Sequence, residues 1–149
     1  MERREFEEND SLRSPQYIFN LLERLGPKKC AFCNCEIPQL IEGAHIWPVA
    51  DIKRESNLSS AQKLEKAIDG SNGIWLCQNH HKLPDFHILV ISNRGKLKMQ
   101  SDLDETSSDY IKNITITNQI PDRVLTSQFA GYLEKRNRAF QDSYYQIWA

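Results

Sequence analysis

All four cysteines and all four histidines of this 149-residue chain lie in one window, between residues 30 and 87. Two residues separate Cys30 from Cys33, and two separate Cys77 from His80. Pairs with this spacing form short turns that present thiolate and imidazole ligands to one tetrahedral zinc ion. We therefore predict a structural zinc site, with one ion per chain, built from these four residues.

Three alternatives to this ligand set remain open. Cys35 competes with Cys33, although the spacing of two residues after Cys30 favours Cys33. His81 could replace His80, but that choice breaks the spacing from Cys77. The cysteines could also be structural and bind no metal.

Composition places the chain among soluble globular proteins. A length of 149 residues suits one domain, and 40% apolar with 26% charged residues is ordinary for such a domain. No apolar run approaches the roughly 18 residues that a membrane span needs. The charged N-terminal segment 1–10 lacks the apolar stretch of a secretory signal. We predict a single domain over residues 1–149, located in the cytoplasm with reduced thiols and no membrane partner.

The charge distribution leaves nucleic-acid binding open. A net charge of -1 argues weakly against it, because proteins that neutralise many phosphates usually carry a basic excess. Acidic residues gather near the N-terminus, however, whereas basic residues collect in four later groups, at 28–29, 53–54, 94–98 and 135–138.

Periodicity and turn residues predict the elements in chain order. Ser14-Pro15, an apolar stripe and Gly26 predict a helix over 14–25. A core over 28–87 follows, and its predicted parts are a strand near 41–46, a surface loop over 51–69 with a helical turn near 60–67, a turn at 70–73, a strand at 74–76 and a short helix over 77–85.

Beyond this core the sequence predicts a hairpin, a loop, a strand and a helix. The hairpin covers 88–99 around a turn at 92–95, and residues 100–109 are polar and typical of a loop. Ile114 and Ile116 alternate with threonines, as in a half-buried strand. A last helix begins at Thr126, so that a C-terminal strand and helix are expected within 113–141.

A second group of residues suggests a site for a hard divalent cation. His81 and Asp85 are four residues apart, which places both side chains on one face of a helix. An imidazole and a carboxylate together can hold magnesium or manganese. The opposite strand would contribute His45.

The segment from Glu42 to Pro48, the segment from Asn72 to Cys77, and His81-x3-Asp85 together resemble the HNH nuclease family. The three positions that give the family its name would be His45, Asn72 and His81. The resemblance covers about 21–99, and residues 132–136 are similar to the tail of HNH domains in restriction endonucleases. It implies an α+β fold with a ββα-metal (His-Me finger) core and a zinc knuckle, flanked by N- and C-terminal helices and a β-hairpin.

The resemblance also implies a metal-dependent DNA endonuclease of restriction type. His45 would be the general base that activates water, and Asn72 would orient it. His81 and Asp85 would bind one Mg²⁺ or Mn²⁺ ion. A homodimer would allow both strands of a double-stranded site to be cut. Contacts with DNA are expected from five basic residues, Lys53, Arg54, Arg94, Lys96 and Arg136.

Two positions depart from the family pattern. Ala44 cannot coordinate a metal, whereas many members carry a ligand directly before the general base. Pro84 replaces an aromatic residue and could bend the helix that aims Asp85. The alternative is therefore a catalytically inactive, zinc-stabilised nucleic-acid-binding module.

Overall fold

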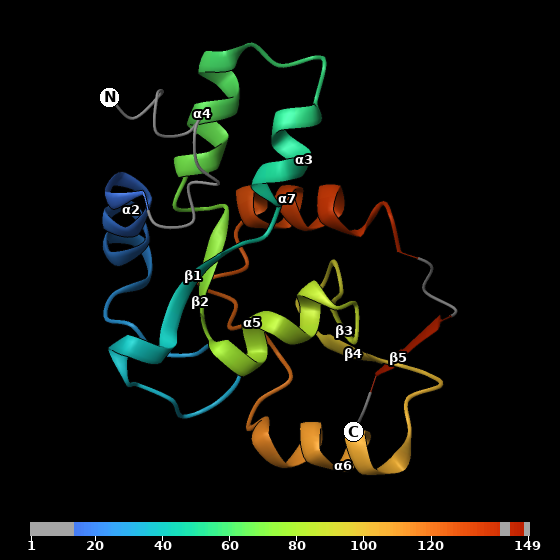
Figure 1. The fold of residues 1–149 in the computed structure, drawn as a ribbon. Coiled ribbons are helices and arrows are strands. Elements are labelled where there is room, and N and C mark those ends of the chain that lie inside the picture. Colours follow the sequence, from blue (N-terminus) through green and yellow to red (C-terminus); the bar gives the residue numbers. More distant parts are fainter. Residues whose placement is uncertain (1–13, 141–143, 148–149) are drawn as a thin grey trace.

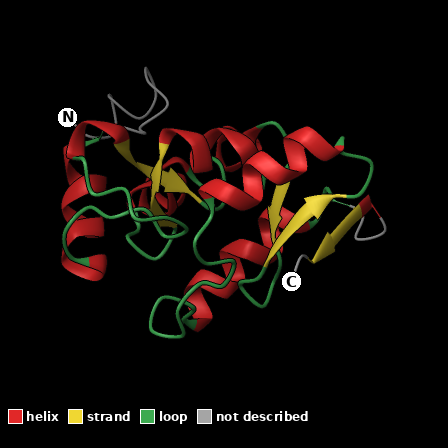
Figure 2. Ribbon diagram, turned by 90° about the horizontal axis from the view of Figure 1, so that it is seen from below, coloured by secondary structure: helices red, strands yellow, loops and turns green. Residues whose placement is uncertain are grey.

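Two small antiparallel sheets joined by helices form a mixed α and β fold, which confirms the predicted class (Figures 1 and 2). The computed structural model describes residues 14–140 and 144–147. The charged segment 1–10 and residue 141, at the end of the predicted C-terminal helix, lie outside the described residues. Among the described helices, none has the length and apolar character to cross a lipid bilayer.

The first sheet and the helix after it form the predicted ββα unit. Strand β1 (Ile41–His45) pairs with β2 (Gly73–Cys77), and His45 lies opposite Gly73. Helix α5 (Gln78–Asp85) follows β2 directly and packs against both strands. Pro84 is tolerated in its last turn, so that the helix continues to Asp85.

Helix α2 (Pro15–Leu25) covers one face of this sheet. Tyr17 and Leu21 are four residues apart and fully buried, so they share the packed face of the helix. Two glycines allow the close approach, because a Cβ on Gly43 would lie 2.6 Å from Leu21 and a Cβ on Gly73 would collide with the Tyr17 hydroxyl. The predicted helix over 14–25 is confirmed.

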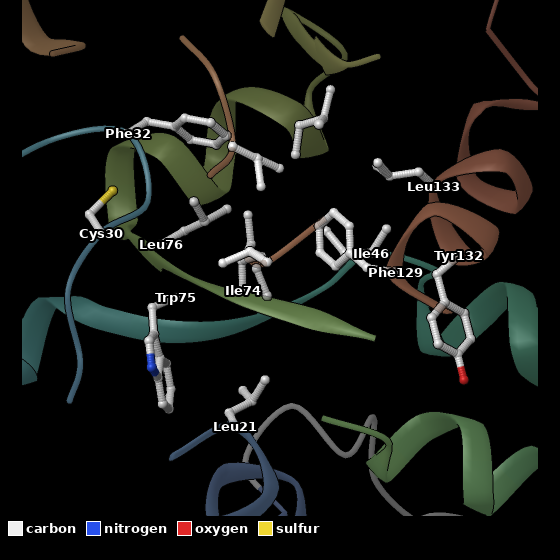
Figure 3. Packing of buried hydrophobic residues seen from close by; sticks show 14 of the residues in the cluster. Leu21, Cys30, Phe32, Ile46, Ile74, Trp75, Leu76, Phe129, Tyr132 and Leu133 are labelled. Carbon is white, nitrogen blue, oxygen red and sulfur yellow. The ribbon is translucent and has the colours of Figure 1, made fainter. Parts of the chain in front are cut away.

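The side chains of β2 alternate between two apolar layers. Trp75 points to the side of the sheet where Leu21 lies, whereas Ile74 and Leu76 point to the opposite side (Figure 3). Both faces of the strand are buried, because all five of its residues are inaccessible to solvent. The ββα unit is therefore held between α2 and the rest of the fold.

Two helices fill the connection between β1 and β2, where a loop with one helical turn was predicted. Helix α4 (Ser60–Ile68) matches that turn, and a capping box between Ser59 and Gln62 starts it. Helix α3 (Val49–Arg54) was missed, because its six residues are too few to show a helical period. A 3-10 turn, η1 (Pro38–Leu40), precedes β1.

The second sheet contains the predicted hairpin. Strands β3 (Leu89–Ile91) and β4 (Leu97–Gln100) pair around a turn in which Gly95 has a φ of +81°. Strand β5 (Tyr145–Ile147) adds to the free edge of β4, which the sequence did not predict.

The predicted strand around Ile114 and Ile116 is wrong. Residues Glu105–Ile114 form helix α6, capped by Asp104, whose side chain accepts a hydrogen bond from the Ser107 amide. Part of the predicted loop over 100–109 is therefore helical too. An alternation of only four residues is weak, and Ile116 is 63% exposed.

Helix α7 (Ser127–Asn137) begins where predicted, with Thr126 as its cap, and ends before Phe140. Tyr132 is buried on its inner face and donates a hydrogen bond of 2.7 Å to Asp69, which precedes β2. This bond holds α7 against the ββα unit.

Candidate active site and metal centre

The four residues of the predicted zinc knuckle lie together, with their ligand atoms all within 4.8 Å of one another. The Sγ atoms of Cys33 and Cys77 are 3.8 Å apart. Nδ1 of His80 is 3.3 Å from Sγ of Cys77 and 3.6 Å from Sγ of Cys30. Cys35 does not belong to this group of ligand atoms.

These separations fit one tetrahedral zinc ion. Zinc–sulfur bonds of about 2.3 Å give a tetrahedron with edges of about 3.8 Å. Burial raises the pKa of the Cys30, Cys33 and Cys77 thiols, so thiolates here are stable only beside a cation. The group could therefore hold a zinc ion that ties the chain before β1 to the start of α5.

Thr115 fixes the orientation of His80. Nε2 of the buried imidazole is 2.9 Å from the Thr115 hydroxyl, so that Nδ1 is left to face the thiols. Burial lowers the pKa of His80 to about 4, which keeps the ring neutral and able to coordinate at pH 7. No such role was predicted for Thr115 from the sequence.

His45 is the last residue of β1. One nitrogen of its imidazole ring forms a hydrogen bond within the protein, and the other nitrogen remains available as an acceptor. Its Nε2 is 2.7 Å from the backbone oxygen of Ala67, in the last turn of α4. A carbonyl only accepts, so Nε2 carries the proton and Nδ1 keeps its lone pair. Nδ1 is buried and has no hydrogen-bond partner among the described residues. The ring stacks on Tyr17 with centroids 4.0 Å apart.

The environment of His45 keeps it neutral. Burial lowers its pKa to about 4, the hydrogen bond to Ala67 opposes this effect, and the neighbouring His81 lowers the pKa further. At pH 7 the imidazole is therefore in the form that accepts a proton.

Asn72 does not touch His45 but fixes the backbone around it. Its Oδ1 accepts from the Trp47 amide at 2.7 Å, and its Nδ2 donates to the carbonyls of Trp47 and Lys66 at 3.2 Å. Lys66 directly precedes Ala67, whose carbonyl holds the imidazole. The fully buried amide is thus a positioning group that joins the chain after β1 to the end of α4.

Carboxylates flank both ring nitrogens of His81. Nε2 is 3.9 Å from Oδ2 of Asp85, one helical turn further along α5. Nδ1 is 3.5 Å from Oε2 of Glu42, which lies on β1. Glu42 lies within the segment that resembles the HNH family, but no role was predicted for it. Its carboxylate, three residues before His45, is the sequence signal that could have indicated one.

A cavity of about 190 Å³ brings these groups to one place. His45, His81 and Asp85 line it, together with Arg136 of α7 and three residues at the start of α3, Pro48, Val49 and Ala50. The cavity thus combines a neutral imidazole with the His81–Asp85 pair and a guanidinium.

Residues 30–92 match the HNH endonuclease family. Over this segment the chain is similar to HNH endonucleases. The matched segment contains the Cys30–His80 metal group, both strands of the ββα unit and the start of the hairpin. This family indicates nuclease activity and a nucleic-acid substrate. No curated protein matches the chain at a significant level.

Arg136 reaches the cavity from outside the matched HNH segment. Its Nη1 donates to the backbone oxygens of Ile46 at 3.1 Å and His45 at 3.4 Å. These bonds hold the guanidinium at the end of β1. Of the five basic residues expected to contact DNA, Arg136 is the one that lines this cavity.

The other four basic residues expected to contact DNA lie elsewhere in the structure. Lys53 and Arg54 end α3, and Arg54 pairs with Asp51. Arg94 and Lys96 belong to the hairpin between β3 and β4, on a separate groove.

Proposed function

We propose that the protein is a metal-dependent endonuclease of restriction type that hydrolyses phosphodiester bonds in double-stranded DNA. One observation carries the proposal: a single cavity holds the buried neutral imidazole of His45 beside the His81–Asp85 pair. A proton acceptor next to a site for a divalent cation is the combination that phosphodiester hydrolysis by water requires.

In this mechanism His45 is the general base. Nδ1 accepts a proton from the water molecule that attacks the phosphorus atom, because Nε2 already carries the ring's own proton. The Ala67 carbonyl then stabilises the charged imidazolium through the same Nε2–H bond. Stacking on Tyr17 prevents the ring from turning away during this transfer.

The α5 residues fit one Mg²⁺ or Mn²⁺ ion. Neighbouring ligand atoms about 2.1 Å from an octahedral ion are about 3.0 Å apart, so a modest approach of His81 Nε2 and Asp85 Oδ2, now separated by 3.9 Å, would let both bind one ion. A divalent cation held here supplies charge neutralisation at the scissile phosphate and the leaving 3′ oxygen. Ala44 offers no ligand, so the chain's own ligands to this ion would be His81 and Asp85.

Glu42 and Arg136 complete the proposed site. Glu42 faces Nδ1 of His81 and so directs Nε2 toward Asp85, as a carboxylate behind a metal-binding histidine commonly does. Arg136 presents a guanidinium to the scissile phosphate, to which its planar group is well suited.

Cleavage of supercoiled plasmid by the zinc-loaded protein tests the proposal. We expect nicked and linear products with Mg²⁺ or Mn²⁺ and none after removal of the divalent cation. Absence of cleavage on plasmids of varied sequence and methylation, by protein that retains one zinc per chain, would favour the inactive binding module. Preferential cleavage of RNA would refute the substrate class, and a sedimentation measurement with DNA would test the homodimer.

A further inference from the structure

A basic groove of about 540 Å³ lies on the hairpin, apart from the catalytic cavity. Three cations line it, Arg94, Lys96 and Lys98, and no acidic residue does. Arg94 and Lys96 are exposed, and no described carboxylate forms an ion pair with either. A surface that carries only positive charge, in a chain whose net charge is -1, favours an anionic partner.

The groove and the catalytic cavity each take one lining residue from the last turn of α7. Asn137 lines the groove, whereas its neighbour Arg136 lines the cavity. Nδ2 of Asn137 donates to the Ile91 carbonyl and to Oδ1 of Asn93, both at 2.8 Å, and so fixes the end of α7 to the hairpin. A nucleic-acid strand with its scissile phosphate in the cavity would therefore pass the groove with its neighbouring phosphates.

Two side-chain amides of the groove, those of Gln119 and Asn137, donate to partners within the protein. Gln119 donates through Nε2 to the carbonyls of Arg94 and Ile120, at 3.1 and 3.0 Å. Asn93 and Asn137 bond to each other. The groove thus offers positive charge, while the amide nitrogens of Gln119 and Asn137 donate within the protein and are not directed at base edges.

On the basis of the proposed function, we infer that this groove binds the phosphodiester backbone of duplex DNA next to the cleavage position, independently of base sequence. Arg94 and Lys96 each neutralise one phosphate. The groove therefore contributes affinity and orientation, and any recognition of sequence must come from other parts of the protein.

The salt dependence of binding tests this inference without requiring cleavage. The probe is a fluorescein-labelled DNA duplex, with zinc-loaded full-length protein and neither Mg²⁺ nor Mn²⁺ present. The logarithm of the binding constant falls as the logarithm of the salt concentration rises, and each lost phosphate contact makes this negative slope shallower by about 0.9. For the double variant Arg94→Ala with Lys96→Ala, the ratio of the wild-type binding constant to that of the variant should fall about twelve-fold between 50 and 200 mM salt.

A matched control separates local contacts from total charge. Lys29→Ala with Lys112→Ala removes the same charge from two exposed residues outside the groove, and its salt slope should equal that of the wild type. The groove variant should also lose affinity equally for duplexes of unrelated sequence. An unchanged slope, an equal change in the control, a sequence-dependent loss, or tighter binding of duplex RNA would each overturn the inference.

The two proposals fail in different ways. Protein that binds DNA with the expected slope but never cuts it would refute the proposed nuclease and leave the groove in place. Protein that cuts DNA but shows no slope change in the groove variant would refute the groove alone.

Discussion

At the scale of single residues, the surroundings of His45 suit its proposed role as a proton acceptor at neutral pH. The side chain is buried, with 6% of its surface exposed, and one nitrogen is committed to the Ala67 carbonyl. The other nitrogen is left with a lone pair and no described partner. Burial thus depresses the pKa of this histidine and, at the same time, leaves it a vacant acceptor.

The depressed pKa predicts a pH-dependent contribution of His45 to stability. The unfolded chain binds a proton at this histidine below about pH 6.5, whereas the folded chain does so only near pH 4. The unfolding free energy of the wild type relative to His45→Asn should therefore fall by about 2 kcal/mol from pH 7 to pH 5. Urea unfolding of both proteins at each pH measures this difference. A difference in unfolding free energy that stays constant with pH would contradict the prediction.

Glu42 should support metal binding through His81. Glu42→Ala removes the carboxylate next to Nδ1, so Mn²⁺ affinity should drop roughly 10- to 100-fold. Glu42→Gln keeps an acceptor oxygen and should lose less. Calorimetric titration of Mn²⁺ into zinc-loaded protein measures both, with the exposed Glu65→Ala as control. Equal Mn²⁺ affinities in all four proteins would show that Glu42 has no part in the site.

At the scale of elements, the sequence predicted what local spacing determines. The interval from Cys77 to His80 runs from the end of β2 into α5, and the interval from His81 to Asp85 lies within α5. The side chains of each pair lie close together, as those intervals predict. Helix α6 was missed because a cap at Asp104 decides its start, while the alternation that suggested a strand spans only four residues.

Contacts between distant segments could not be predicted. Tyr17 stacks on a histidine in β1, Thr115 orients His80, and Arg136 reaches a strand about ninety residues earlier. None of these pairs has a sequence signature, because only the packing of α2, of α7 and of the segment after α6 brings them together.

The zinc group should determine the stability of the ββα unit. Cys30→Ser should lose zinc and unfold at lower urea concentration, since the ion joins the chain before β1 to α5. Cys35→Ser should keep one zinc per chain and wild-type stability. Elemental analysis together with urea unfolding checks both, and a Cys35→Ser protein without zinc would show that the ligand set is wrong.

At the scale of the whole molecule, elements from outside the matched HNH segment complete the site. Helix α2 lies against the first sheet (Figure 1) and contributes Tyr17, whereas α7 contributes Arg136 to the lining of the cavity. The same helix separates the cavity from the basic groove. The proposed chemistry and the proposed DNA contact therefore depend on one packed arrangement.

The most direct test compares the plasmid cleavage rates of His45→Ala and His87→Ala at pH 7.5 with saturating Mg²⁺ or Mn²⁺. His87 is exposed and lies outside the cavity, so its variant controls for loss of an imidazole. We predict that His45→Ala cuts 10²- to 10⁴-fold more slowly, roughly the contribution of a general base, while retaining one zinc per chain. His87→Ala should cut at the wild-type rate. Wild-type cleavage by zinc-loaded His45→Ala would contradict the assignment of His45 as the base.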